Sequence, residues 1–189
     1  MVIGSRSTDK AEKTAADLSA ATSGRVRGAA NAAAAAACDL VLVVVPYDGH
    51  AELLRELKPV LDGKIVVDCV HPLGFDKQGA YALPVKKGSA TEQAAAILTQ
   101  STVVGAFHNV SAVLLEDAGI DSVDTDVLVL GDDRDATDLV QALADTVPGM
   151  RGVNGGRKRN AQQVEALTAN LISMNRRYEA HAGVRITDI

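Results

Sequence analysis

Met1-Val2-Ile3-Gly4-Ser5-Arg6-Ser7 is the stretch of sequence that decides the fold. Its apolar beginning predicts the end of a β-strand, and its small and basic residues predict a loop that leads directly into a helix. The helix is expected over about residues 8–21, with Ser7 or Thr8 as its N-cap. In a doubly wound α/β sheet such a loop follows the second strand and contacts the ribose of a bound dinucleotide.

Arg6 indicates which dinucleotide this loop would bind. An acidic residue at this place accepts the ribose hydroxyls of NAD, whereas an arginine pairs with the additional phosphate of NADP. Arg6 lies between Ser5 and Ser7, so the sequence favours NADP. The alternative is a solvated arginine at a helix start, although a cation there opposes the helix dipole unless an anion lies nearby.

Two apolar runs, residues 40–45 and 64–69, predict the central strands. They lack polar alternation, which is typical of parallel strands that are covered on both faces. A helix over about residues 48–61 separates them, and this alternation predicts an α/β fold with a parallel sheet. Further strands are expected over residues 26–28, 103–107 and 127–130, and a loop is expected over residues 72–88. Further helices are expected over residues 31–37, 89–98, 135–146 and 161–180.

Composition limits the classes of function. The chain has 189 residues, 47% hydrophobic content and a net charge of −5, which argues against nucleic acid or an anionic membrane as the main partner. Cys38 and Cys69 are too few and too far apart to predict a disulfide framework or a zinc site. We expect a cytoplasmic protein with a nucleotide-binding domain over residues 1–150 and a C-terminal helical segment over residues 151–189.

The expected strand ends supply the candidate binding residues, because ligands of open α/β sheets bind beyond the carboxyl ends of the strands. Pro46 and Tyr47 either line a cofactor groove or simply end a strand. His108 is the best polar candidate for the reacting centre. The histidines and cysteines have no metal-ligand spacing, so no metal site is predicted.

Two charged stretches have alternative interpretations. Residues 155–159 form the densest basic cluster, which either holds an anionic coenzyme or is a solvated loop. Asp132 and Asp133 are better explained by a turn and an N-cap than by a cation site. No nucleophile motif is present, and hydride transfer needs none, because two rings held face to face supply most of the chemistry.

Taken together, several segments resemble the NADPH-dependent coenzyme F420 reductases. The resemblance implies a Rossmann-type domain with a small C-terminal helical part, a homodimer, and reversible hydride exchange between NADP(H) and the 5-deazaflavin coenzyme F420. The segments follow the family order over nearly the whole chain and are residues 2–6, 44–47, 64–68, 103–110, 131–133, 175–178 and 183–187.

The resemblance also implies roles for individual residues. Ser5, Arg6 and Ser7 would hold the 2′-phosphate of NADP, and Pro46 and Tyr47 would line the cofactor groove. The loop after the strand at 103–107 would lie against the stacked deazaflavin and nicotinamide rings; its residues are His108, Asn109, Val110, Ser111 and Ala112. Family members carry a proline in this loop where this chain has Ser111.

The family pattern begins with a strand, a Gly-rich turn and a helix, which together span about thirty residues. The amides of that turn bind the pyrophosphate. We therefore expect Met1 to be a late start, and residues 1–189 alone to bind NADPH weakly and to have poor solubility. Two other functions stay open: an NADP-dependent reductase of an imine, a keto acid or a metal chelate, and a non-catalytic dimeric protein of the same fold.

Overall fold

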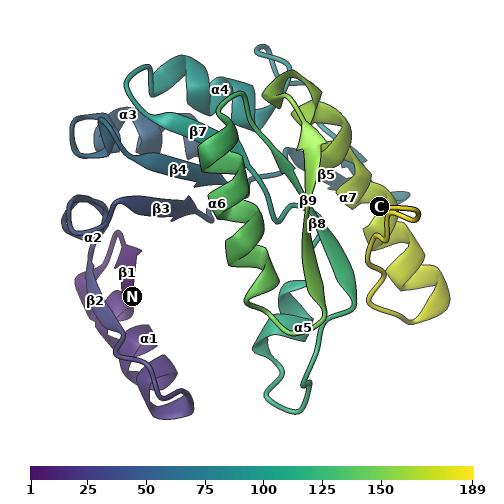
Figure 1. The fold of residues 1–189 in the computed structure, drawn as a ribbon, viewed down its shortest axis with the longest axis horizontal. Helices are drawn as coiled ribbons and strands as arrows, with labels where there is room; N and C mark the ends of the chain where they lie inside the picture. The colour runs from purple at the N-terminus through teal and green to yellow at the C-terminus, as the bar shows by residue number, and fades with distance from the viewer.

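Five strands form the central sheet of the computed structural model, which describes residues 1–189 (Figure 1). In sheet order they are β3 (Leu40–Val43), β4 (Ile65–Asp68), β7 (Thr102–Gly105), β8 (Thr125–Leu130) and β9 (Met150–Gly156). The first three are parallel to one another, as are the last two. β7 and β8 are antiparallel and pair only at Gly105 and Leu130. The predicted α/β class with a mostly parallel sheet is confirmed.

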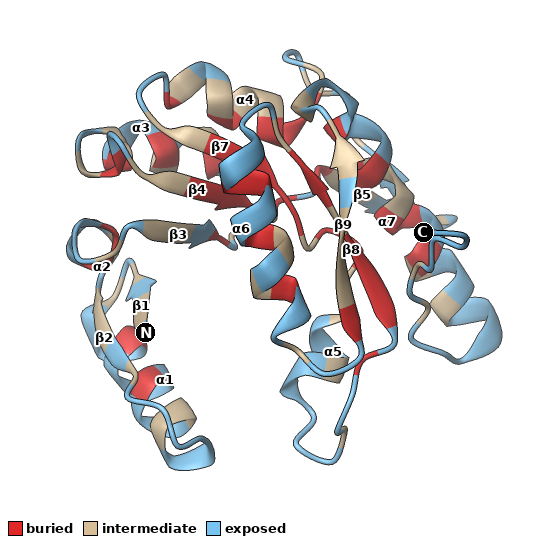
Figure 2. Cartoon of the chain, viewed as in Figure 1, coloured by how far each residue is buried: buried red, intermediate tan, exposed pale blue.

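Helices cover both faces of this sheet, and they are α3 (His50–Leu61), α4 (Ala90–Ile97) and α6 (Arg134–Asp145). Successive residues of a strand point to opposite faces. Accordingly Val66 and Val103 belong to the core cluster beneath α3 and α4, whereas Val67 and Val104 belong to the cluster beneath α6. The inner strands β4 and β7 are thus buried on both sides (Figure 2), which confirms the prediction made for the apolar run at residues 64–69.

The N-terminal residues form a separate small unit (Figure 1). Its elements are β1 (Val2–Ser5), α1 (Thr8–Ala21), β2 (Arg27–Ala30) and α2 (Asn31–Ala36). β1 and β2 make a parallel pair on which α1 packs, and α2 contacts both β1 and α3. Gly28 permits the close approach of α1 to β2, because a Cβ at this position would lie 2.2 Å from the backbone nitrogen of Glu12.

Strand β3 differs from the prediction for residues 40–45. The strand ends at Val43, and the side chains of Leu42 and Val44 are 44% and 72% exposed, so the expectation of two covered faces is wrong here. The reason is its position, since β3 pairs only with β4 and forms an edge of the five-stranded sheet. β1 likewise pairs only with β2.

A β-hairpin occupies part of the segment that was predicted to be a loop over residues 72–88. Its strands are β5 (Leu73–Asp76) and β6 (Gly79–Ala82), and it packs against the last helix, α7 (Ala161–Tyr178). The side chain of Asp76 accepts hydrogen bonds from the backbone amides of Gln78 and Gly79, which closes the turn. Gly79 has φ of 124°, a conformation that favours glycine.

Strand β9 was also missed by the sequence interpretation. Residues 151–156, which were expected in the C-terminal helical segment, pair with β8 inside the central sheet. The short helices α5 (Ala112–Glu116) and η1 (Lys158–Asn160) complete the fold. None of the helices has the length and apolar composition that a membrane span requires.

Candidate functional site

The residues predicted to bind coenzymes lie at the carboxyl ends of three parallel strands. Ser5 is the last residue of β1, and Arg6 and Ser7 follow it directly. Pro46 and Tyr47 come shortly after β3, and the loop His108–Ala112 comes shortly after β7. The first of these strand ends belongs to the pair β1–β2 and the other two to the five-stranded sheet, and ligands of open α/β sheets bind beyond strand ends of this kind.

Arg6 is an exposed cation without a partner. Its guanidinium takes part in none of the ion pairs of the structure. Ser7 is the N-cap of α1, as predicted, and its hydroxyl accepts a hydrogen bond from the amide of Lys10 at 3.4 Å. Ser5 Oγ accepts one from the amide of Ser7 at 3.2 Å. A positive group and two hydroxyls thus surround the start of a helix, which is a suitable environment for a phosphate.

A buried ion pair connects the start of α3 to the end of β4. His50 Nε2 lies 2.8 Å from Asp68 Oδ2, and both side chains are fully buried. The ring of Tyr47 lies beside that of His50, with 6.2 Å between the centroids. Burial alone would lower the pKa of His50, but the hydrogen bond and charge of Asp68, together with the hydrogen bond to Gln93 and the charge of Glu165, outweigh burial and raise it.

A second buried carboxylate, that of Glu165, binds the first turn of α4. It accepts hydrogen bonds from the amides of Ala90 and Thr91 at 2.8 and 3.0 Å, and from the Thr91 hydroxyl at 2.9 Å. Burial raises the pKa of Glu165, and these hydrogen bonds oppose the shift. Glu165 joins α7 to the carboxyl end of the sheet, because α4 packs against both β4 and β7.

His108 is fully buried beside these groups, and neither of its ring nitrogens has a hydrogen-bond partner. Burial lowers its pKa to about 4, so the imidazole is neutral at pH 7. Its backbone carbonyl accepts a hydrogen bond from Thr168 Oγ1 of α7 at 2.8 Å. Phe107, directly before it, has φ of 65°, an uncommon conformation for a residue other than glycine that is often found at functional sites.

Gly105 provides the space in which His108 is packed. A Cβ at this position would lie 2.6 Å from Thr91 Oγ1 and 3.2 Å from His108 Cε1. We expect Gly105→Ala to lower the free energy of unfolding by about 1–3 kcal/mol, as overpacking of a core does. Urea unfolding would measure it, with Gly24→Ala as the control, because a Cβ there meets only Thr22 Oγ1 at 3.7 Å. An equal effect of both substitutions would contradict the prediction.

The fold brings some predicted residues together and leaves others apart. Tyr47 lies beside His50, which binds Asp68, and the amide of Ala106, two residues before His108, donates to the Asp68 carbonyl at 3.1 Å. Arg6 belongs to the other sheet. Sequence reasoning missed Asp68, His50 and Glu165 as members of the site. The available signal was Asp68 itself, because a carboxylate that ends a wholly apolar strand needs a buried partner.

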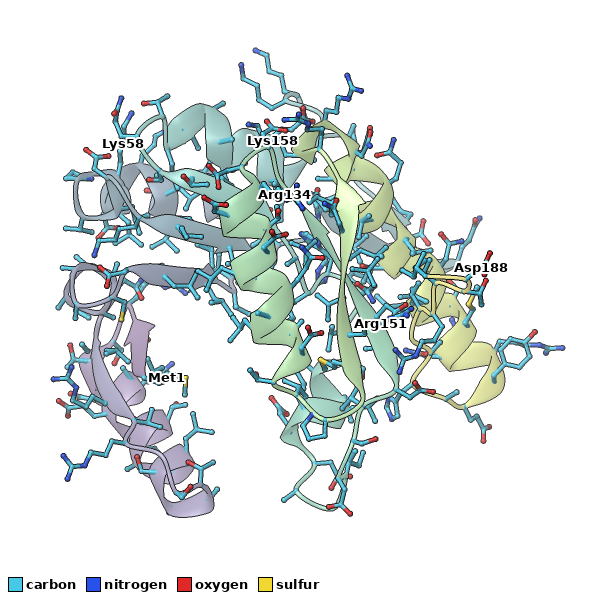
Figure 3. The ribbon with its side chains drawn as sticks, in the orientation of Figure 1. Met1, Lys58, Arg134, Arg151, Lys158 and Asp188 are labelled. Carbon is cyan, nitrogen blue, oxygen red and sulfur yellow. The ribbon has the colours of Figure 1, made fainter.

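The remaining charged candidates are explained by local contacts. Asp133 is the N-cap of α6, with its carboxylate accepting from the Ala136 amide at 2.9 Å, as predicted. Asp132 pairs with Lys158, and Arg157 Nη1 lies 4.0 Å from the same carboxylate. A surface cavity of about 360 Å³ lies at this basic cluster. Lys158 lies far from Met1 in Figure 3, and whether this cluster holds an anionic coenzyme stays a prediction.

Comparison with known proteins gives consistent results along the whole chain. The family described as NADP oxidoreductase coenzyme F420-dependent matches residues 1–72. The chain is 35% identical to the F420-dependent NADP reductase of Methanocaldococcus jannaschii and 33% identical to that of Methanothermobacter marburgensis; each match covers 100% of this chain and 88% of the relative.

A solved structure agrees with these relatives. It is a protein from Arthrobacter sp. FB24 whose name places it with the F420-dependent NADP reductases, and it matches with a TM-score of 0.78 and 26% identity over 99% of this chain and 88% of that one. Sequence identity above 30% along the full chain, together with this fold, shows that the protein belongs to the family of F420-dependent NADP reductases.

Proposed function

We propose that this protein transfers a hydride reversibly between NADP(H) and the 5-deazaflavin coenzyme F420. The observation that carries the proposal is the full-length identity of 35% to an F420-dependent NADP reductase. The fold is consistent with it, because the candidate residues lie at the carboxyl ends of parallel strands, where dinucleotides bind in such sheets.

In this proposal Arg6, Ser5 and Ser7 bind the 2′-phosphate of NADP(H). The support is electrostatic, since Arg6 is a cation without a carboxylate partner in a chain of net charge −5. A guanidinium donates paired hydrogen bonds to phosphate oxygens, and the hydroxyls of Ser5 and Ser7 can add neutral ones. No carboxylate of the described ion pairs would have to be displaced first.

The loop His108–Ala112 is proposed to bind the two reacting rings, with Pro46 and Tyr47 along the groove. Polar atoms in this loop fit a ring with carbonyl and N–H groups, because both His108 nitrogens and Asn109 Oδ1 are buried without partners. A neutral His108 can donate one hydrogen bond and accept another without introducing a charge beside the rings. The coenzymes supply the hydride chemistry, and the loop supplies orientation and excludes water.

The experiment that tests the function follows the absorbance of oxidised F420 after mixing with NADPH and the protein. We expect bleaching of the deazaflavin band that depends on protein concentration, and the reverse reaction with reduced F420 and NADP. Circular dichroism establishes that the sample is folded. A folded protein that produces no bleaching over hours would favour the non-catalytic alternative.

Two properties of the whole protein belong to the same proposal: a cytoplasmic location and a homodimeric state. The apolar surface for a second copy is available on α7, where Met174 and Tyr178 are 44% and 74% exposed. On the same helix Val164 and Leu171 are buried inside the protein.

A further inference from the structure

The C-terminal segment after α7 lies along the beginning of β8. The Asp126 amide donates to the Val184 carbonyl at 2.6 Å, and the Val184 amide donates to Thr125 Oγ1 at 3.0 Å. Gly183 permits this approach, because a Cβ there would lie 2.7 Å from Thr125 Oγ1. Figure 1 shows the segment in yellow beside α7, and Figure 3 places Arg151 and Asp188 on the same side of the molecule.

Asp126 is the charged anchor of this segment. Its carboxylate is fully buried and accepts hydrogen bonds from Arg185 Nη1 at 2.6 Å and from the Ile186 amide at 2.7 Å. Arg151 of β9 binds the same carboxylate through Nε and Nη2, at 3.0 and 2.7 Å. Arg185 in turn donates to Asp124 and to the Gly149 carbonyl. The segment is thus held by charge-assisted bonds, which are the stronger kind.

The same part of β8 holds the loop His108–Ala112. Asn109 Nδ2 donates to the backbone carbonyl of Asp126 at 2.7 Å and lies 3.5 Å from Thr125 Oγ1. The C-terminal segment also reaches the loop directly, because His181 Nδ1 lies 3.4 Å from Ser111 Oγ. Apart from the Thr168 bond to His108, the side-chain hydrogen bonds of this loop therefore depend on the first residues of β8 or on the C-terminal segment.

We propose that residues 181–186 form a strap that holds the loop His108–Ala112 in its coenzyme-binding conformation, with Arg185 and Asp126 as positioning residues. The inference rests on the proposed function for the role of the loop. Physically, the strap occupies the N–H of Asp126 and its carboxylate, while the loop occupies its carbonyl. Release of the strap therefore leaves the residue on which the loop depends held only by Arg151 and strand β9.

Arg185→Ala tests the role of the strap, because it removes the charged contact of the strap with Asp126 and leaves Asp126 paired with Arg151. We expect hydrogen exchange of the amides in residues 107–112 to become about tenfold faster, because the variant loses the charge-assisted hydrogen bonds of Arg185 to Asp126 and Asp124. The amides of β7 and of residues 127–130 should exchange at unchanged rates. The KM for F420 should rise by a similar factor, whereas the KM for NADPH should stay within about twofold.

Two variants complete the test. Arg185→Lys keeps the charge beside Asp126. Hydrogen exchange of residues 107–112 and the KM for F420 should both lie between the values of wild type and Arg185→Ala. Arg55→Ala removes an exposed arginine of α3 that has no ion pair and should change neither. The proposed role of the strap would be overturned if Arg185→Ala left the hydrogen-exchange rates of the loop unchanged. It would also be overturned if the rates in the loop and in the sheet rose equally. A wild-type protein without F420 reduction would instead overturn the proposed function, and the exchange measurement would still decide the inference.

Discussion

Replacement of Asp68 by alanine is expected to lower the free energy of unfolding by about 3–5 kcal/mol, the largest stability effect that we predict. The substitution leaves the fully buried ring of His50 without its charged partner at 2.8 Å. It also removes the acceptor for the Val70 amide, which donates to Asp68 Oδ1 at 3.0 Å. A buried group that loses its partner bears its full desolvation penalty.

Urea unfolding at constant pH measures this effect. Asp62→Ala is the matched control, because Asp62 is exposed at the end of α3, and it should change stability by less than about 0.5 kcal/mol. The double substitution Asp68→Ala with His50→Leu should recover part of the loss, since it removes the unpaired partner as well. If Asp68→Ala lowered the free energy of unfolding by less than about 1 kcal/mol, the Asp68–His50 pair would contribute no more than an exposed ion pair does, and the prediction would be wrong.

The Asp68 pair also predicts a dependence on pH. The folded protein raises the pKa of His50 above its ordinary value, because burial is outweighed by the hydrogen bond and charge of Asp68, the largest raising causes, together with Gln93 and Glu165. The stability that His50 contributes is therefore fully present below the unfolded pKa of about 6.5 and is lost as the pH rises through the folded value. The difference in the free energy of unfolding between wild type and Asp68→Asn should therefore become smaller as the pH rises from about 6.5 through the folded pKa of His50.

Arg6→Ala is expected to weaken NADPH binding by about 10- to 100-fold, the amount that hydrogen bonds to a charged group contribute. The affinity for NADH should stay nearly the same, because NADH has no 2′-phosphate for the guanidinium to bind. The reason lies in the structure, where Arg6 is exposed next to the start of α1 and makes no ion pair. Fluorescence titration with the two nucleotides measures the ratio of the Kd values.

Two further variants make this experiment specific for the 2′-phosphate. Arg6→Lys retains the charge but loses the planar pair of donors, so its affinity should lie between those of wild type and Arg6→Ala. Lys10→Ala removes a neighbouring exposed cation one turn further along α1 and should have a smaller effect. If Arg6→Ala weakened NADPH and NADH equally, the proposed role of Arg6 would be wrong.

Local patterns predicted much of the fold correctly. Helix α1 begins and ends where the sequence placed it, at Thr8 and Ala21. The helix expected over residues 89–98 begins directly after Ser89, whose Oγ accepts a hydrogen bond from the Glu92 amide. These features depend on residues only a few positions apart. The hairpin at residues 73–82 and strand β9 were missed, because their glycine-rich sequences lack the apolar runs that indicate strands, and they form by pairing and by packing on other elements.

The sequence by itself determined the α/β class, the apolar central strands and the basic loop that contains Arg6. These features follow from periodicity, capping and residue chemistry among residues that lie close together in the chain. Only the tertiary structure decided which polar groups meet beneath the loop after β7. Asp68 and His50 are 18 residues apart, Glu165 and Thr91 are 74 apart, and Arg185 and Asp126 are 59 apart. Contacts over such separations depend on how whole elements pack, which no local pattern specifies.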